Sequence, residues 1–128
     1  MIKVKVFKEK PYPVSSPKIK KSLKTFLEKE GIVSETVVSV ALVEEEKILK
    51  LAKDYLKEKG VVHNVLSFPT KEVRGEFIDP LGKINLGEIV VCYPKACSEA
   101  KYEGTLIEDK VIELTLHGAL HLMGIHHT

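Results

Sequence analysis

The stretch from Thr36 to Val43 constrains the fold of this chain more than any other segment. Its sequence, TVVSVALV, is a nearly continuous apolar run that is rich in β-branched residues. A half-exposed strand would alternate apolar and polar side chains, so a continuous run is typical of a strand covered on both faces. The run therefore predicts a sheet that lies between other layers of structure.

Three further strands are predicted from the apolar pattern. Residues 2–6 alternate hydrophobic side chains with lysines at a period of two, which is typical of a half-buried strand. Residues 61–68 and 86–92 are mainly apolar and short enough to be strands. The region between them, 70–85, contains glycines and an Asp-Pro pair, so we expect a loop or an irregular hairpin there.

Two helices are predicted in the first half of the chain. The pair Ser16-Pro17 fits an N-cap followed by a proline in the first turn, and apolar residues recur at helical spacing until Gly31. The glutamates at 44–46 place negative charge at the positive end of a second helix. This helix is predicted to end near Gly60.

Two more helices are predicted near the C-terminus. The first begins at Pro94 and stops at Gly104. The second starts with a capping box at residues 105–108 and is apolar on most sides up to Met123, so we expect it to be buried. Together the pattern predicts an α/β fold in which residues 1–128 form a single domain. It has a small mixed sheet of about four strands and about four to five helices.

Charge is distributed unevenly along the chain. Residues 1–30 hold nine lysines and three glutamates, whereas residues 31–128 hold eleven basic and fifteen acidic residues. The first segment is therefore +6 and the second −4 at neutral pH. A basic segment of this kind fits either an ordinary solvated surface or contact with a polyanion such as RNA.

The sequence also bears on the cellular compartment. Cys92 and Cys97 match neither a CxxC pair nor the framework of a disulfide-rich secreted domain. The alternating N-terminus lacks the apolar core of a signal peptide, and no stretch reaches the ~18 apolar residues of a membrane span. We therefore expect a cytoplasmic protein that does not contact membranes.

Four of the five histidines lie in the last twelve residues. His117 and His121 are four residues apart, so on a helix their imidazoles project from one face and can bind one metal ion. Gly124 is expected to end the helix and let His127 approach the same ion. Three imidazoles and a water form the open tetrahedral site of catalytic zinc. We predict one zinc ion per chain at this C-terminal helix, with His126 as the alternative third ligand.

The alternative is that these histidines are ordinary core or surface residues. An isolated pair four apart would favour that interpretation, but the added glycine and third histidine favour metal binding. The spacing H-x-x-x-H-x-x-G-x-x-H equals that of metzincin metalloproteases, whose general-base glutamate would sit at position 118. This chain has Gly118 there, so peptide hydrolysis by that mechanism is not supported. The nearest carboxylate on the same face is Glu113, for which a supporting role is favoured.

Three segments resemble the YbeY family in order and in spacing. Residues 117–127, HGALHLMGIHH, closely resemble the family signature HGxLHLxGYDH. Residues 64–69, NVLSFP, resemble its T-[DN]-V-L-S-F-P segment, and residues 86–91, LGEIVV, resemble its LGDIVI strand. Members of this family are bacterial zinc-dependent, single-strand-specific endoribonucleases that act in ribosomal RNA maturation and ribosome quality control.

The resemblance implies roles for individual residues. The three histidines at 117, 121 and 127 correspond to the zinc ligands, and Asn64 and Ser67 belong to the strand beside the metal, as candidates to contact substrate. Lys57 takes the place of a family arginine implicated in activity and is the catalytic candidate. Lysine offers a point charge where arginine offers a planar fork to phosphate. The chain also has His63 in place of the signature threonine and His126 in place of its aspartate.

By this resemblance the chain is expected to process ribosomal RNA, including the 3′ end of 16S rRNA, with RNA and the ribosome as partners and DNA not expected. Lysines of the first helix are candidates to hold the RNA backbone: Lys18, Lys20, Lys21 and Lys24. The alternative function is a zinc-binding, ribosome-associated protein with a structural metal, and a metalloprotease is less favoured. Nucleophile and oligomeric state are left open.

Overall fold

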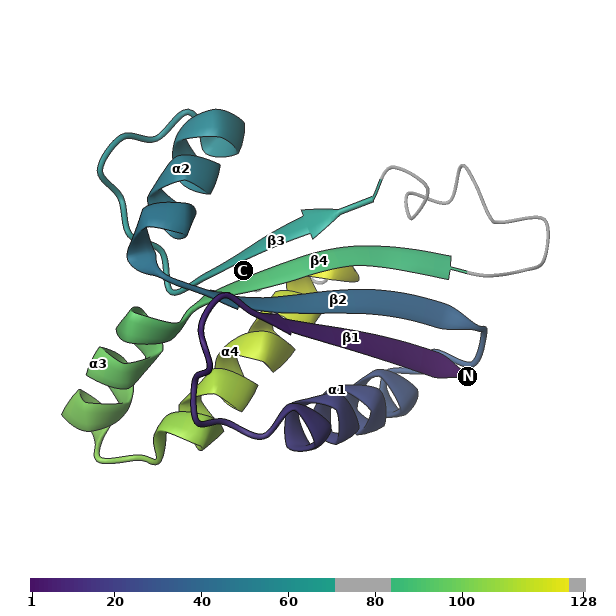
Figure 1. Cartoon of the computed structure of the whole chain (residues 1–128). Helices are drawn as coiled ribbons and strands as arrows, with labels where there is room; N and C mark the ends of the chain where they lie inside the picture. The colour runs from purple at the N-terminus through teal and green to yellow at the C-terminus, as the bar shows by residue number, and fades with distance from the viewer. Residues whose placement is uncertain (71–83, 125–128) are drawn as a thin grey trace.

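The computed structural model describes residues 1–70 and 84–124, which form a four-stranded sheet with helices on both faces (Figure 1). The order of strands and helices predicted from the sequence is confirmed, with four helices in the described part of the chain. The elements are β1 (Ile2–Lys8), α1 (Ser16–Lys29), β2 (Thr36–Val43), α2 (Glu45–Leu56), β3 (Val65–Pro69), β4 (Ile84–Cys92), α3 (Tyr93–Glu103) and α4 (Ile107–Leu122).

The sheet is mixed and has the order β1-β2-β4-β3. β1 and β4 both pair with β2 in parallel, and β3 pairs with β4 in the antiparallel sense. Thr36, at the start of β2, lies opposite Ile2 on one side and Ile84 on the other. The apolar run that begins at Thr36 is therefore a central strand, as its composition predicts.

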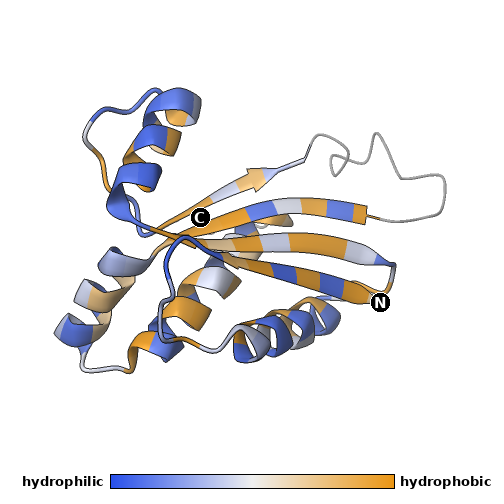
Figure 2. Ribbon diagram, in the orientation of Figure 1, coloured by the Kyte–Doolittle hydropathy of each residue, from blue (hydrophilic) through white to orange (hydrophobic). Residues whose placement is uncertain are grey.

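The larger core lies between one face of the sheet and the helices α1 and α4 (Figure 1). α1 contributes Ile19, Leu23 and Leu27, which recur at helical spacing and are almost fully buried. Burying such a side chain stabilises the fold by about 1.5–3 kcal/mol. β1 turns alternate side chains into this core, which gives the alternating hydrophobic and hydrophilic bands along β1 in Figure 2.

α2 packs on the other face of the sheet and forms a second, smaller core (Figure 1). Ile48 and Ala52 of this helix are fully buried. The helix has only 12 residues and covers one end of the sheet, so Ser39 and Ala41 of β2 stay half-buried. The prediction of a strand covered on both faces is therefore only partly met. The larger core covers β2 along one face, whereas α2 covers only one end of the other face.

Several predicted boundaries differ from the structure. α2 ends at Leu56 instead of near Gly60, because Lys57 adopts the left-handed conformation (φ 59°) and stops the helix. β3 begins at Val65 instead of residue 61, and β4 begins at Ile84, two residues earlier than predicted. β3 is limited to the residues that pair with β4, Val65–Pro69. The apolar pattern of the sequence does not show which residues will pair, so it could not give this boundary.

The predicted helix caps also need correction. Ser15, not Ser16, is the N-cap of α1, and its hydroxyl accepts a hydrogen bond from the Lys18 N–H at 3.2 Å. The predicted capping box of α4 does not form, since the N-cap of α4 is Leu106 and makes no side-chain cap bond. Glu108 instead accepts a hydrogen bond from the Ser15 N–H at 2.8 Å, so it joins α4 to the start of α1. No described helix is long and apolar enough to cross a membrane.

Candidate metal centre

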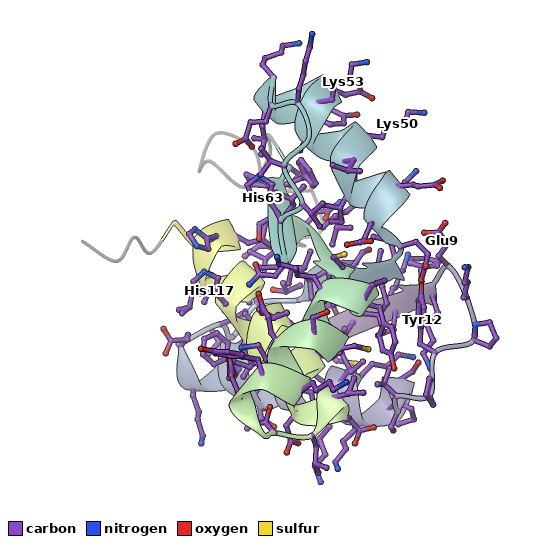
Figure 3. All side chains as sticks on the ribbon, turned by 90° about the vertical axis from the view of Figure 1, so that its left-hand side faces the viewer. Glu9, Tyr12, Lys50, Lys53, His63 and His117 are labelled. Atoms are coloured by element: carbon purple, nitrogen blue, oxygen red, sulfur yellow. The ribbon has the colours of Figure 1, made fainter. Side chains whose placement is uncertain are left out.

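His117 and His121 lie one turn apart on the exposed side of α4, and Figure 3 shows His117 on the outer side of this helix. Their Nε2 atoms are 3.1 Å apart and their ring centroids 4.6 Å apart, with an interplanar angle of 73°. Both Nε2 atoms therefore point to one shared region beside the helix. This is the convergence that the spacing of four residues predicts.

The distance between the two nitrogens tests whether the pair fits a zinc ion. With Zn–N bonds of about 2.0–2.1 Å and tetrahedral angles, two ligand nitrogens lie about 3.3–3.4 Å apart. The separation of 3.1 Å between Nε2 of His117 and Nε2 of His121 is close to that value. The pair therefore fits two positions of a zinc site, and imidazole is a preferred zinc ligand.

The remaining ligand candidates lie outside the described residues. His127 and the alternative His126 are both in the segment 125–128, so the structure does not place them relative to the pair. Residues 1–70 and 84–124 contain no group of three potential metal ligands. The zinc ion therefore stays a prediction, and the structure describes two of its three predicted ligands.

The end of α4 has the geometry that the sequence predicts. Gly124 has φ +75°, a left-handed conformation that favours glycine, and its N–H donates to the carbonyl oxygen of His121 at 3.0 Å. The helix thus ends at Leu122, one residue after His121. The left-handed conformation thus occurs at the glycine where the motif is expected to end the helix.

Gly118 lies between the two histidines in sequence but faces the sheet. A Cβ atom at this position would lie 2.6 Å from Cγ2 of Ile89 and 3.0 Å from Oγ of Ser67. Any side chain would therefore collide with β4 and β3, and it would point away from the exposed histidine face. The position that holds the general base in the protease motif is not available for a carboxylate in this fold.

Ser67, a predicted substrate-side residue, lies on β3 next to α4. Its hydroxyl donates to the carbonyl oxygen of Gly118 at 2.9 Å. The structure therefore brings Ser67 to the helix turn that carries His117. In this arrangement the hydroxyl joins the edge strand to the helix, and Ser67 itself is half-buried.

Asn64, the second substrate-side candidate, precedes β3 and contacts α3. Its side-chain amide donates to both carboxylate oxygens of Glu99, at 3.2 and 3.3 Å. Glu99 also lies 3.7 Å from the ammonium of Lys110 on α4. Asn64 is thus linked through Glu99 to the helix that carries the histidines.

Lys110 is a buried charged residue that the sequence analysis did not single out. Its side chain is 7% exposed and its Nζ lies 3.0 Å from Glu103 and 2.8 Å from Glu113. Hydrogen bonds that the ammonium donates to these two carboxylates, Glu113 foremost, raise the pKa of Lys110. Glu113 is therefore ion-paired one turn before His117. The sequence did offer a sign of this buried charge, because Lys110 lies within the apolar pattern of a helix that is predicted to be buried.

Lys57 is not brought to the histidine pair. It is exposed at the end of α2, which packs on the opposite face of the sheet from α4 (Figure 1). Its ammonium donates to the carbonyl oxygen of Asp54 at 3.4 Å, within its own helix. His63, in the segment that follows, lies 2.7 Å from Glu58 through its Nε2.

The lysines of α1 fall into two groups. Lys18 forms an ion pair with Glu108 of α4 at 3.0 Å, and this contact raises the pKa of the lysine. Lys20, Lys21 and Lys24 are exposed. Of the four RNA-contact candidates, Lys18 therefore has a role in joining α1 to α4.

Comparison with known proteins agrees with this fold. The family described as Endoribonuclease YbeY matches residues 7–128. An Endoribonuclease YbeY from Macrococcus caseolyticus is 35% identical over 111 residues, which cover 87% of this chain and 71% of that protein. One from Renibacterium salmoninarum is 38% identical over 94 residues, which cover 73% and 59% respectively.

A solved structure gives the same result for the fold. The solution structure of the protein TM1509 from Thermotoga maritima is similar with a TM-score of 0.59 and 27% sequence identity. The similarity covers 98% of this chain and 75% of that protein. The four-stranded mixed sheet with its helices is therefore shared with an experimentally determined structure.

Proposed function

The chain belongs to the Endoribonuclease YbeY family, and from this premise we propose that it is a zinc-dependent, single-strand-specific endoribonuclease. It acts in the cytoplasm in ribosomal RNA maturation, including the 3′ end of 16S rRNA, and in ribosome quality control. The observation that carries the proposal is the family match over residues 7–128. The Nε2 atoms of His117 and His121, 3.1 Å apart on an exposed helix face, support its metal dependence.

The proposed zinc ligands are His117, His121 and His127. When bound, zinc supplies Lewis-acid stabilisation of the negative charge that develops on a phosphodiester oxygen. The two described histidines face solvent and are therefore accessible to a polymer substrate. A site open on one side suits an RNA strand better than it suits a small molecule enclosed in a pocket.

Residues around the pair keep it in position. The hydrogen bond from Ser67 to Gly118 holds the histidine-bearing turn of α4 against β3. The ion pairs of Lys110 join the preceding turns to α3. We further propose that Lys57 contacts a phosphate of the bound RNA that is remote from the phosphate at which cleavage takes place. Lys57 lies at the end of α2, on the other side of the sheet from the histidines of α4.

Peptide hydrolysis is disfavoured by the same geometry. The general base of the protease motif would occupy position 118, where a Cβ atom would already be 2.6 Å from Ile89. Glu113, the nearest carboxylate on the histidine face, is held by Lys110 at 2.8 Å. RNA cleavage assisted by a metal and by cations requires no carboxylate at position 118.

Metal analysis combined with two substrates tests the proposal. Purified protein should contain one zinc per chain and should cut single-stranded RNA but not the matching duplex or casein. His117→Ala and His121→Ala proteins should lose both zinc and cleavage. His63→Ala is the matched control, because His63 contacts Glu58 and is not among the proposed ligands.

Two results would decide against the proposal. Cleavage of casein alone, abolished by a chelator, would identify a protease. Full RNA cleavage by His117→Ala protein with undiminished zinc would show that the pair is not the metal site. If His127→Ala protein keeps its zinc, the third ligand is His126.

A further inference from the structure

Part of the sheet face opposite α4 is left uncovered by α2. We call the open face the surface made by Lys3, Lys5 and Phe7 of β1, Ser39 and Ala41 of β2, and Phe68 of β3. Strand register places these side chains in rows: Phe7 lies beside Ala41, and Lys5 lies beside Ser39. Both rows continue through β4, where Glu88 lies opposite Phe68.

The open face is hollowed along its middle. Ala41, a small residue of the central strand β2, lines the hollow, whereas the rings of Phe7 and Phe68 stand on the outer strands β1 and β3. Two adjoining hollows, of about 300 and 310 Å³, share Ala41, Val43 and Lys47 in their walls. Phe7 lines one hollow, and Tyr55 and Phe68 line the other.

The aromatic rings at both ends are accessible. Phe7 is 59% exposed and Tyr55 is 67% exposed. The Tyr55 ring contacts Phe68, with centroids 5.3 Å apart and an interplanar angle of 58°. Phe7 and β3 are separated by three strand spacings, or about 14 Å. Two separate aromatic surfaces thus flank one shallow trough.

The charge beside this trough is mainly positive. Lys3 and Lys5 are exposed on the same side of β1 as Phe7, because alternate residues of β1 enter the core below. Lys47 of α2 lines both hollows. Of the described residues that line the hollow beside Tyr55 and Phe68, Glu88 is the acidic one, and Glu9 is the acidic one in the hollow beside Phe7. A carboxylate in the floor of the trough can accept a hydrogen bond from a base amino group.

We propose that the open face binds a stretch of single-stranded RNA, with bases stacked on Phe7 and on the Tyr55–Phe68 pair and with phosphates beside Lys3 and Lys5. The inference rests on the proposed function, because it places part of the substrate of that reaction. Exposed aromatic rings on a sheet combined with nearby lysines are the elements that bind single strands without strong sequence preference. A protein partner would be served by a continuous apolar surface, whereas here the charged residues Lys47 and Glu88 line the trough between the rings.

Binding measurements on matched variants test this platform. The probe is fluorescein-labelled single-stranded 2′-O-methyl RNA of about 12 nucleotides, a length within the range of single-strand platforms. Its integrity is checked on a gel after each measurement. Fluorescence anisotropy should show that Phe7→Ala raises the Kd about five- to 150-fold, the effect of losing one stacked base. Tyr102→Ala, which removes a 93% exposed ring on α3, should leave the Kd unchanged.

Salt dependence tests the lysines in the same assay. A Lys3→Ala, Lys5→Ala double variant should reduce the slope of log K against log salt by about 1.4, because two phosphate contacts are lost. A Lys20→Ala, Lys24→Ala double variant tests α1 as the competing site. A Lys29→Ala, Lys101→Ala double variant, which removes two other exposed lysines, is the control and should keep the wild-type slope. Thermal unfolding of each variant shows whether it is folded.

Each outcome separates the platform from the proposed function. Cleavage of RNA with unchanged Kd and slope in the open-face variants would overturn the platform and keep the endoribonuclease. Binding that depends on Phe7 without any RNA cleavage would keep the platform and overturn the endoribonuclease. If the salt-dependence slope falls only in the Lys20→Ala, Lys24→Ala variant, the RNA binds along α1 and not on the open face. Self-association that Phe7→Ala abolishes, without an effect on RNA binding, would assign the open face to a second copy of the chain.

Discussion

The hydroxyl of Ser67 donates to the carbonyl oxygen of Gly118 at 2.9 Å, so this one side chain joins the edge strand β3 directly to the backbone of the histidine-bearing helix α4. The contact depends on the missing Cβ of Gly118, because that atom would lie 3.0 Å from the same hydroxyl. The strand and the position of the histidines are therefore mechanically coupled.

Gly118→Ala should destabilise the protein by about 1–3 kcal/mol, the usual range for an overpacked core. The added methyl would lie 2.6 Å from Cγ2 of Ile89, within a rigid strand. Denaturant unfolding measures the change in the free energy of unfolding. In an Ile89→Ala background the cost should become smaller, because the colliding atom is gone. An equal cost in both backgrounds would contradict the close approach.

Lys110→Met should lower the free energy of unfolding by about 1–3 kcal/mol. Removal of a buried ion-pair partner leaves carboxylates without their cation, but here Glu103 and Glu113 are 43% and 65% exposed, so water compensates part of the loss. Lys101→Met, at an exposed position of α3, is the matched control and should change stability by less than about 0.5 kcal/mol. Equal stability of the two variants would show that the ion pairs contribute nothing.

Glu108→Gln should weaken the protein at neutral pH but not in acid. The N–H of Ser15 and then the ammonium of Lys18 hold the pKa of Glu108 below its ordinary value of 4.5. A carboxyl whose folded-state pKa is lowered stabilises the fold above its unfolded-state value, and this contribution is lost as pH falls through the folded-state value. The difference in melting temperature between wild type and Glu108→Gln should therefore be largest at neutral pH, and it should vanish once the pH falls below the lowered folded-state pKa of Glu108.

A second variant identifies the partner responsible. Lys18→Met leaves the Ser15 hydrogen bond in place, so most of the acid dependence should persist in this protein. If Lys18→Met abolishes the pH dependence as completely as Glu108→Gln does, the ion pair is the main cause.

Lys57→Ala should reduce RNA cleavage about tenfold or more if the ammonium contacts a phosphate, since hydrogen bonds to charged groups contribute about 1.5–3 kcal/mol. Lys57→Arg should keep or raise the rate. Both variants retain a side chain at a left-handed position (φ 59°), so backbone strain does not distinguish them. Lys59→Ala is the control for a general loss of positive charge. Equal rates of RNA cleavage in all these proteins, at equal zinc content, would show that Lys57 is an ordinary surface residue.

The sequence was sufficient for those parts of the fold that depend on local pattern. The apolar run at 36–43, the periodicity of the helices and the left-handed turn at Gly124 all report on neighbouring residues, and all were predictable. Strand order was not predictable, because the pairing of β2 with β4 depends on contacts between distant segments.

Prediction of the site had the same limit. The spacing of His117 and His121 was sufficient for their convergence, because both lie on one helix. Glu108 was assigned to a local capping box, yet it contacts Ser15 across the interface between α1 and α4. The polar cluster around Lys110 involves carboxylates from two helices, and no local pattern reports which of several acidic residues will meet a buried lysine.

The strand order also has a consequence for the kinetics of folding. The central pair joins Thr36 to Ile84, which are 48 positions apart in the chain, and such distant pairing slows the search for the native topology. α4 docks on Ile89 and Ser67, which belong to strands that must first be brought together. The two described imidazoles should therefore reach their native place late in refolding. Zinc added to the unfolded chain should leave the rate of the main folding phase unchanged and act mainly by slowing unfolding.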